Sequence, residues 1–256
     1  YLGVNINSVL MSFKSYDPIS DTWSHVGLAN FKAVIYDLRN LPDLTYAFSN
    51  SITAWLAGLL INIPVGLLFA YYIYKRFIGW KFFRVILFLP SIVSSGVLMI
   101  MFKYYADSFL PNIINAVFNT DYFGLLSQRS TEFTTILAFN IFIGFGVSVL
   151  MYVGSMTGIS ESLIEAGELD GANKLQEFFY IVLPQIFSTV SVFIVTGVAT
   201  MFVNQLNLYS LYFSRASNYL YTVGYYIYMN IERAGLSYGV YPYFASLSVI
   251  ITLIVA

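Results

Sequence analysis

The chain has 256 residues, of which 58% are hydrophobic and only 10% are charged. Soluble domains carry roughly 25% charged residues, so this composition argues for a membrane protein. The net charge of −1 and the absence of cysteine argue against a nucleic-acid partner, a disulfide framework and a thiolate metal site.

Apolar runs in chain order predict an all-α integral membrane protein. Residues 1–13 resemble the closing turns of a first span. Five further runs contain no Lys, Arg, Asp or Glu: 52–74, 85–102, 133–153, 186–203 and 243–256. A helix needs about 20 apolar residues to cross the hydrocarbon core, and the last run is shorter than that. The sequence therefore predicts about six transmembrane helices, with the first and the last incomplete in this chain.

Basic residues indicate the orientation. The short loop between the second and third predicted spans carries Lys75, Arg76, Lys81 and Arg84. Such residues concentrate in short cytoplasmic loops, so we place this loop in the cytoplasm. Counting spans puts the loop between the fourth and fifth spans on the same side. The uncharged runs also argue against a self-contained, ion-driven carrier, because such proteins usually place ionisable residues within their spans.

That loop between the fourth and fifth spans, residues 160–184, is a polar segment between two apolar runs. Ser160 or Ser162 can cap the start of a short helix through its hydroxyl group. Leu163, Ala166 and then Leu169 or Ala172 recur at helical spacing, which predicts a narrow apolar stripe. Gly171 can end a turn, and Pro184 suits the point where the next span begins or bends.

The same segment resembles the EAA loop of permease subunits from binding-protein-dependent ABC importers, whose pattern runs EAA-x-x-DGA, then F, then I-x-LP. The matching residues are Glu165, Ala166, Asp170, Gly171, Ala172, Phe178, Ile181, Leu183 and Pro184. Gly167 stands where the family usually has a second alanine. GLANF at 27–31 and FFRVILFLPSIVS at 82–94 resemble sugar-class permeases of the first of two paired types. The resemblance implies one ABC-transporter type I transmembrane domain over residues 1–256, with a coupling loop at about 158–184.

In that family the loop helix docks on an ATPase subunit and transmits its closure to the spans. The resemblance implies that this contact is made by Glu165, Ala166, Gly167, Asp170, Gly171, Ala172 and Pro184. The alternative is an interfacial helix lying on lipid headgroups, but an acidic helix suits an anionic leaflet poorly. The implied partners are a second permease subunit, two ATPases, an extracytoplasmic solute-binding protein and membrane lipid, in a bacterial or archaeal cell membrane.

The chain is not expected to be an enzyme or to bind a cofactor. It has no G-x-x-x-x-G-K-[ST] phosphate-binding loop, so ATP and magnesium are expected in the partner ATPase. Its single histidine, His25, lies in a predicted external loop without clustered carboxylates, and no metal site is predicted.

Polar residues on two predicted spans are candidates for a substrate path. Along the fifth span, Thr196, Thr200, Asn204 and Asn207 recur at helical spacing and are expected to share one face, and Asn140, Gly144 and Ser148 recur every four residues on the fourth. Helix packing is the alternative for both stripes. The path candidates are Asn140, Thr200, Asn204, Asn207 and Tyr209. Spans without Arg or Lys favour a neutral sugar or oligosaccharide. Another neutral solute or a glycerol-phosphate-type solute is the alternative.

Overall fold

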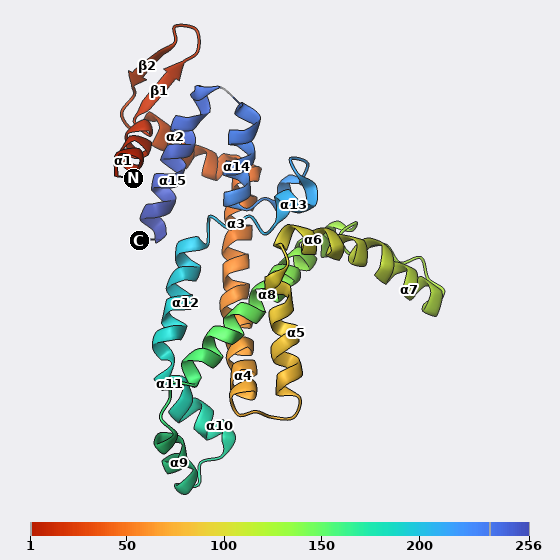
Figure 1. Cartoon of the computed structure of the whole chain (residues 1–256). Coiled ribbons are helices and arrows are strands. Elements are labelled where there is room, and N and C mark those ends of the chain that lie inside the picture. Colours follow the sequence, from red (N-terminus) through yellow and green to blue (C-terminus); the bar gives the residue numbers. More distant parts are fainter. Residues whose placement is uncertain (1, 236, 256) are drawn as a thin grey trace. The chain divides into compact units, whose positions relative to one another are not determined.

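The computed structural model describes residues 2–235 and 237–255, and almost all of its regular structure is helical (Figure 1). The predicted all-α class is confirmed, with one short β-hairpin added. The chain divides into two compact units, Tyr1–Thr53 with Val198–Ala256, and Ala54–Gly197. We call them the terminal unit and the central unit. The assignment of residues 1–256 to one transmembrane domain stays a prediction.

The terminal unit combines the two ends of the chain. Its elements are α1 (Leu2–Met11), β1 (Lys14–Asp17), β2 (Thr22–His25), α2 (Ala29–Asn40), most of α3 (Pro42–Ala57), α13 (Leu208–Tyr212), the 3-10 turn Asn218–Leu220, α14 (Val223–Ala234), the 3-10 turn Tyr238–Val240 and α15 (Tyr241–Val255). The hairpin pairs Lys14 with His25 and Asp17 with Thr22 in an antiparallel register. Asp17 holds its turn, because its carboxylate accepts hydrogen bonds from the Ile19 N–H and the Ser20 hydroxyl.

The central unit contains the segment that resembles the coupling loop. Its elements are the π-helical turn Gly58–Asn62, α4 (Ile63–Tyr74), α5 (Trp80–Ile92), α6 (Ser95–Tyr104), the π-helical turn Tyr105–Phe109, α7 (Leu110–Phe118), α8 (Arg129–Met156), α9 (Glu161–Leu169), α10 (Lys174–Gln176), the π-helical turn Glu177–Val182, α11 (Leu183–Gln185) and most of α12 (Phe187–Thr200). Its core gathers residues from α4, α8, α9 and the turn Glu177–Val182, including Tyr71, Tyr152, Ile164 and Phe178. Gly146 lets the backbones of α8 and α5 meet, because a Cβ there would collide with the Leu87 carbonyl group.

Among the described residues, three helices are long and apolar enough to cross a membrane: Pro42–Tyr74, Arg129–Met156 and Tyr238–Val255. Two bent pairs raise the number to five if each counts as one span: Trp80–Ile92 with Ser95–Phe118, bent by 104°, and Lys174–Gln185 with Phe187–Thr200, bent by 68°. Each predicted run from 52 to 256 overlaps one of these segments, although the run 186–203 continues past Thr200, where the last helix of its pair ends, and Ala256 lies outside the described residues. Helix α1, at 10 residues, is too short to span by itself, so the predicted incomplete first span stays a prediction.

The run 85–102 is not one straight helix. Pro90 lies inside α5 and has no N–H to donate. Helix α5 ends two residues later, at Ile92. Val93 is extended, with φ of −94° and ψ of 142°, and Ser94 precedes the start of α6. The apolar composition of this run does not distinguish a bent helix from a straight one, whereas Pro90 within the run is a sequence signal for the break.

Candidate functional site

The start of α9 is fixed by a side-chain cap. Ser160 is extended, and its hydroxyl oxygen accepts a hydrogen bond from the Leu163 N–H at 3.4 Å. This bond satisfies one of the N–H groups that every helix start leaves without an intrahelical partner. Of the two serines that the sequence offered, Ser160 is therefore the cap. The Ser162 hydroxyl group lies 3.0 Å from that of Ser160.

The end of α9 is a glycine stop. Gly171 has a φ of +81°, in the left-handed region that favours glycine. Around it the Gly171 N–H donates to the Glu168 carbonyl at 3.1 Å, and the Ala172 N–H donates to the Gly167 carbonyl at 3.0 Å. These two bonds form a Schellman motif, which satisfies the last carbonyl groups of the helix. The expectation that Gly171 ends a turn is confirmed.

One side of α9 is built into the central unit. Ile164 is 8% exposed and belongs to the same buried cluster as Phe178 and Val182. Gly167 is also buried, and a Cβ at this position would collide with the Cδ1 atom of Ile181. Here the glycine that replaces the family's usual alanine makes room for the Ile181 side chain. Gly167 therefore contacts its own chain, while its predicted role toward an ATPase stays a prediction.

The segment then turns back toward the next span. Asn173 forms a capping box with Gln176: its side chain accepts from the Leu175 and Gln176 N–H groups, and the Gln176 side chain accepts from the Asn173 N–H. The π-helical turn Glu177–Val182 follows, and Pro184 is exposed in α11 just before the 68° bend. The expectation that Pro184 lies where a span begins or bends is confirmed.

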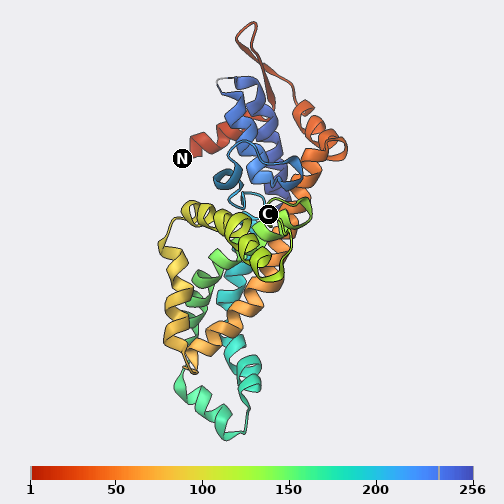
Figure 2. The same ribbon diagram turned by 90° about the vertical axis from the view of Figure 1, so that its right-hand side faces the viewer.

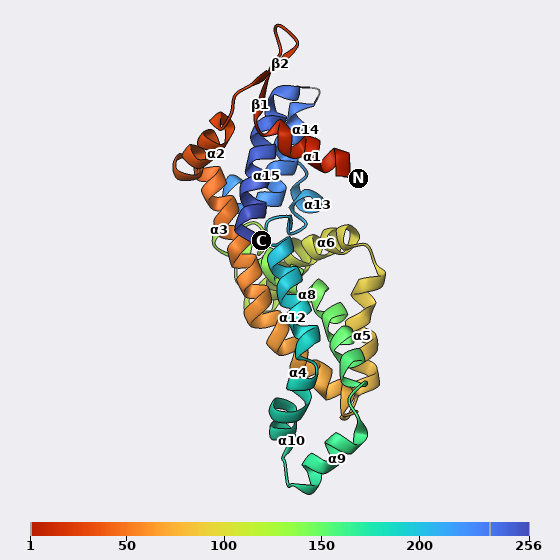
Figure 3. The same ribbon diagram turned by 90° about the vertical axis from the view of Figure 1, so that its left-hand side faces the viewer.

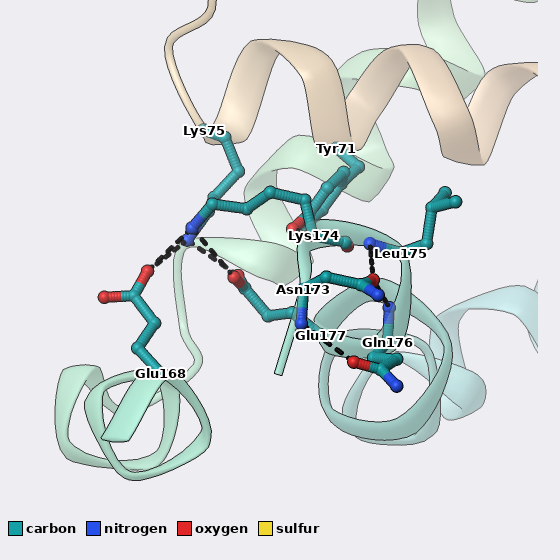
Figure 4. A network of polar contacts seen from close by, with 8 residues as sticks. All are labelled: Tyr71, Lys75, Glu168, Asn173, Lys174, Leu175, Gln176 and Glu177. Carbon is teal, nitrogen blue, oxygen red and sulfur yellow. Dashed lines mark hydrogen bonds and ion pairs between the residues drawn. The ribbon is translucent and has the colours of Figure 1, made fainter. Parts of the chain in front are cut away.

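Four charged side chains tie this segment to the end of α4 (Figure 4). The Lys75 Nζ atom lies 2.7 Å from Glu177 Oε1 and 3.6 Å from Glu168 Oε1. The Lys174 Nζ atom lies 2.7 Å from Glu168 Oε1 and 3.2 Å from Glu177 Oε2. We call Lys75, Glu168, Lys174 and Glu177 the charge cluster. Its two positive and two negative charges balance. A carboxylate can be buried at tolerable cost only when cations of this kind pair with it.

Burial differs sharply across the charge cluster. The Glu177 side chain has an exposure of 0% and that of Lys75 14%, whereas Glu168 and Lys174 are half exposed. The hydrogen bond from Lys174, with the positive charges of Lys174 and Lys75, holds the pKa of Glu168 below its usual range. The contact of Lys75 with Glu177 Oε1 is an ion pair, since no well-angled hydrogen bond reaches that oxygen among the described residues.

Tyr71 adds a neutral contact to the same place. Its ring lies 5.1 Å from that of Phe178, and its hydroxyl group donates to the Lys174 carbonyl at 3.1 Å. Together with the charge cluster, this contact shows that the α4–α5 connection and α9 lie at one end of the central unit, as Figures 2 and 3 also show. The two loops therefore lie at the same end of the central unit, and the prediction that this end faces the cytoplasm stays a prediction.

Sequence analysis missed the charge cluster. Lys75 was read only as an orientation signal, and Glu168, Lys174 and Glu177 were not singled out. One signal was present: Glu177 directly precedes Phe178 in an apolar stretch, and a buried acid needs a cationic partner. The identity of that partner depends on folding, because Lys75 lies in a different loop.

The remaining predicted coupling residues form an exposed acidic end of the segment. Glu165, Ala166, Asp170 and Gly171 are exposed and Ala172 is half-buried. Leu169 lies between them and is 88% exposed. A hollow of about 300 Å³ adjoins this end, and it is lined by Asp170, Gly171, Ala172, Gln176, Tyr180 and Ile181. We call Glu165, Ala166, Leu169, Asp170 and Gly171 the α9 outer face.

The predicted polar face of the fifth span is wrong beyond Thr200. Helix α12 ends at that residue, so Asn204 and Asn207 do not continue its face. The Asn204 side chain accepts a hydrogen bond from the Leu206 N–H at 2.9 Å, and Leu206 and Asn207 both have positive φ. This local bond competes with helix formation, as asparagine side chains often do. Whether Thr200, Asn204 or Asn207 touches a substrate stays a prediction.

The other two path candidates, Asn140 and Tyr209, belong to different units of the chain. Asn140 belongs to the central unit, and its amide donates to the Ile136 carbonyl of its own helix at 2.9 Å. Tyr209 belongs to the terminal unit, where its hydroxyl group donates to Glu232 at 3.3 Å and its ring meets Tyr228. A pocket of about 560 Å³ in the terminal unit is lined by Phe202, Val203, Gln205, Gly224, Ile227, Tyr228, Ile231, Glu232, Ser248, Ile251 and Thr252. None of the predicted path residues lines it.

Comparison with known protein families assigns the chain to one of them. Residues 62–256 match the family described as binding-protein-dependent transport system inner membrane component. The chain belongs to this family. The family's description makes the chain an inner-membrane component of a transport system, in agreement with its several apolar helices.

Individual relatives are more distant. The chain is 26% identical over 195 residues to the arabinooligosaccharide transport system permease protein AraP of Bacillus subtilis, which covers 75% of this chain and 60% of AraP. It is 29% identical over 187 residues to the sn-glycerol-3-phosphate transport system permease protein UgpA of Yersinia pseudotuberculosis, covering 72% and 61%. The chain thus spans about three-fifths of the length of these curated relatives.

A solved structure shares the fold. The chain aligns with a bacterial ABC transporter involved in the import of the acidic polysaccharide alginate, with a TM-score of 0.74 and 22% identity. The alignment covers 100% of this chain and 87% of that chain. The two chains therefore share a fold, in agreement with the family match over residues 62–256.

Proposed function

We propose that the chain is a permease subunit of an ABC importer that carries a sugar or oligosaccharide, and that α9 couples the membrane helices to a separate ATPase. The observation that carries the coupling role is the construction of α9. One side is locked to the core through Ile164 and Gly167, and the outer face, with Glu165 and Asp170, is left in solvent. A helix built in this way can pass a push from a soluble partner to the spans as a rigid element.

The complete importer contains more than this chain. We propose a second permease subunit, two ATPases that bind ATP and magnesium, and an extracytoplasmic solute-binding protein. The family's description supports the binding protein, and the absence of a phosphate-binding loop supports a separate ATPase. The chain itself is then a non-catalytic subunit in a bacterial or archaeal cell membrane.

The substrate class rests on the relatives and on charge. The AraP relatives carry arabinooligosaccharides by name, which supports an oligosaccharide for this chain. The UgpA relative favours sn-glycerol-3-phosphate as a second candidate. A phosphate ester would favour a cation along the path, and the apolar runs 133–153 and 186–203 of the fourth and fifth spans contain no Lys or Arg. We therefore favour the neutral sugar.

Cross-linking tests the coupling role directly, because the chain has no native cysteine. Glu165→Cys places one thiol on the α9 outer face, and the control Ile19→Cys places one on the hairpin tip, where Ile19 is 95% exposed. In membranes containing the assembled importer, we expect a short bifunctional reagent to join Glu165→Cys, and not Ile19→Cys, to the ATPase. Equal cross-linking of both variants, or of neither, would contradict the coupling role.

Uptake into vesicles tests the substrate class separately. Vesicles containing the importer and its binding protein should take up a radiolabelled arabinooligosaccharide in an ATP-dependent manner and should leave sn-glycerol-3-phosphate outside. The reverse selectivity would replace the first substrate candidate by the second while leaving the coupling role intact.

A further inference from the structure

Three cations beside the charge cluster have no carboxylate partner among the described residues. Arg76, Lys81 and Arg84 are all exposed, and none of them forms a described ion pair. Lys75, from the same loop, forms ion pairs with Glu168 and Glu177. The loop therefore neutralises one of its four basic side chains internally and presents the other three outward.

The loop that carries these cations has a defined backbone. Arg76 and Gly79 both have positive φ, of +54° and +80°, and they reverse the chain between α4 and α5. The Tyr72 hydroxyl group donates to the Ile78 carbonyl, and the Trp80 N–H donates to the Phe77 carbonyl. Arg76 thus lies in a hydrogen-bonded turn, and Lys81 and Arg84 lie in the first turns of α5.

One indole ring gathers two of the cations. The Arg76 guanidinium carbon lies 5.9 Å and the Lys81 Nζ atom 5.7 Å from the centre of the Trp80 ring, within the range of a cation–π contact. Tryptophan prefers the headgroup level of a bilayer. Ile78, 95% exposed at the turn, provides an apolar anchor beside them.

An apolar groove begins at the third cation. A hollow of about 320 Å³ is lined by Arg84, Val85, Phe88, Leu89 and Ile92 of α5 and by Leu150 of α8. The α5 residues recur at three to four positions, so the groove follows one face of that helix away from the loop. No residue of α5 is buried, and Val85 and Ile92 are 63% and 71% exposed.

We propose that this groove and the three cations form a site for one anionic phospholipid. The headgroup phosphate sits among Arg76, Lys81 and Arg84, and an acyl chain lies along Val85, Leu89 and Ile92. Charge complementarity favours this occupant. Arg84 lines the groove, Arg76 and Lys81 share the Trp80 ring at the start of the same helix, and an anionic headgroup supplies the negative charge that these three cations lack among the described residues. The site goes beyond the proposed transport role and does not depend on it.

Photo-cross-linking of the assembled importer tests the site. The probes are phosphatidylglycerol and phosphatidylcholine, each with a diazirine on one acyl chain and each mixed at the same low fraction into phosphatidylcholine vesicles. Labelled peptides are then mapped by mass spectrometry. We expect phosphatidylglycerol to label residues 85–92 at least fivefold more than phosphatidylcholine does, and 0.5 M salt to reduce this preference.

Matched variants separate a site from general attraction. A juxtamembrane cation contributes about fivefold in affinity for anionic lipid, so Lys81→Gln and Arg84→Gln should each lower the preference by about that factor. Arg84→Lys should keep most of it. The control Arg39→Gln removes a cation from the end of α2, in the other unit, and should leave the preference unchanged.

Two results would overturn the proposal. Equal labelling by the two lipids, or an unchanged preference in both glutamine variants, would show that the cations do not select a headgroup. Protection of residues 85–92 from both lipids, with Leu89→Cys cross-linking to the second permease subunit, would show that protein covers the groove. Neither result bears on ATP coupling, which is measured independently.

Discussion

At the scale of single residues, the carboxylate of Glu177 is the fully buried charged group near α9, and its burial costs free energy unless it is paired. Removing a carboxylate from water costs several kcal/mol unless cations replace the lost hydration. Lys75 and Lys174 supply them at 2.7 and 3.2 Å, from α4 and from the start of α10. Glu177 therefore joins two segments far apart in the sequence, and its neutralisation should loosen both.

We predict that Glu177→Gln lowers the free energy of unfolding by about 3 kcal/mol or more, because it leaves the mostly buried Lys75 ammonium without its closest partner. Thermal unfolding in detergent checks this. Glu161→Gln, in the exposed first turn of α9, serves as the control and should change stability by less than about 0.5 kcal/mol. The double variant Lys75→Met, Glu177→Leu should recover most of the loss, because an apolar pair needs no hydration. An equal loss in the control and in Glu177→Gln would contradict the account of the charge cluster.

Gly167 gives a second prediction at this scale. Gly167→Ala restores the residue usual in the family, and it should gain about 1 kcal/mol in helix propensity but lose about 1–3 kcal/mol by overpacking against Ile181. Adding Ile181→Val removes the colliding Cδ1 atom, so the double variant should be at least as stable as the wild type. If Gly167→Ala alone is as stable as the double variant, Ile181 moves aside freely and the close contact has no cost.

At the scale of the element, α9 is a short helix whose ends are set by local chemistry. Both limits could be predicted, since Ser160 and Gly171 act through bonds to residues within five positions. The early end of α12 could not be predicted, because its polar residues continue at helical spacing up to Asn207, although the backbone at Leu206 and Asn207 is left-handed. The charge cluster could not either, because it depends on tertiary folding. Local signals thus predicted where α9 lies, and packing decided which of its sides is free.

The glycine stop of α9 is testable. Gly171→Ala should destabilise the segment by about 1–2 kcal/mol, because a φ of +81° is strained for any residue with a Cβ, although nothing lies within 4 Å of the new atom. Gly154→Ala is the matched control, since it lies inside α8 with open space around it and should keep or slightly raise stability. Hydrogen exchange of residues 161–172 measures the local effect. Similar protection in the two variants would exclude a Schellman stop.

The pH dependence of the α9 anchor follows from Glu168. The folded state lowers its pKa through Lys174 and Lys75, so its stabilising contribution is complete above the ordinary value of about 4.3 and is lost as the pH falls through the lower folded value. The difference in melting temperature between the wild type and Glu168→Gln should therefore be constant from pH 5 to pH 8 and should shrink under more acidic conditions. A difference that grows as the pH falls would have the wrong sign for this ion pair.

At the scale of the whole molecule, the family and the construction of α9 lead to one account. The chain belongs to the inner-membrane components of binding-protein-dependent transport systems, and its loop helix is fastened to α4 and to the segment that leads into α12. A soluble ATPase pressing on the α9 outer face would thus move several membrane helices together. The composition and the loop motif were sufficient to predict this class, because apolar runs reflect exposure to lipid and the motif is local in sequence. The substrate path stays a prediction, and its candidate residues Asn140 and Tyr209 belong to different units.

The most direct test of this account measures ATP hydrolysis and sugar uptake in the same vesicles. Ala166→Pro breaks the middle of α9 at a cost of about 3 kcal/mol, whereas Glu161→Pro occupies the first helical position, where proline is tolerated. We predict that Ala166→Pro abolishes uptake per ATP hydrolysed, or loses the ATPase from the complex, while Glu161→Pro retains the wild-type ratio. Normal uptake per ATP in Ala166→Pro would contradict the claim that α9 acts as a rigid coupling helix.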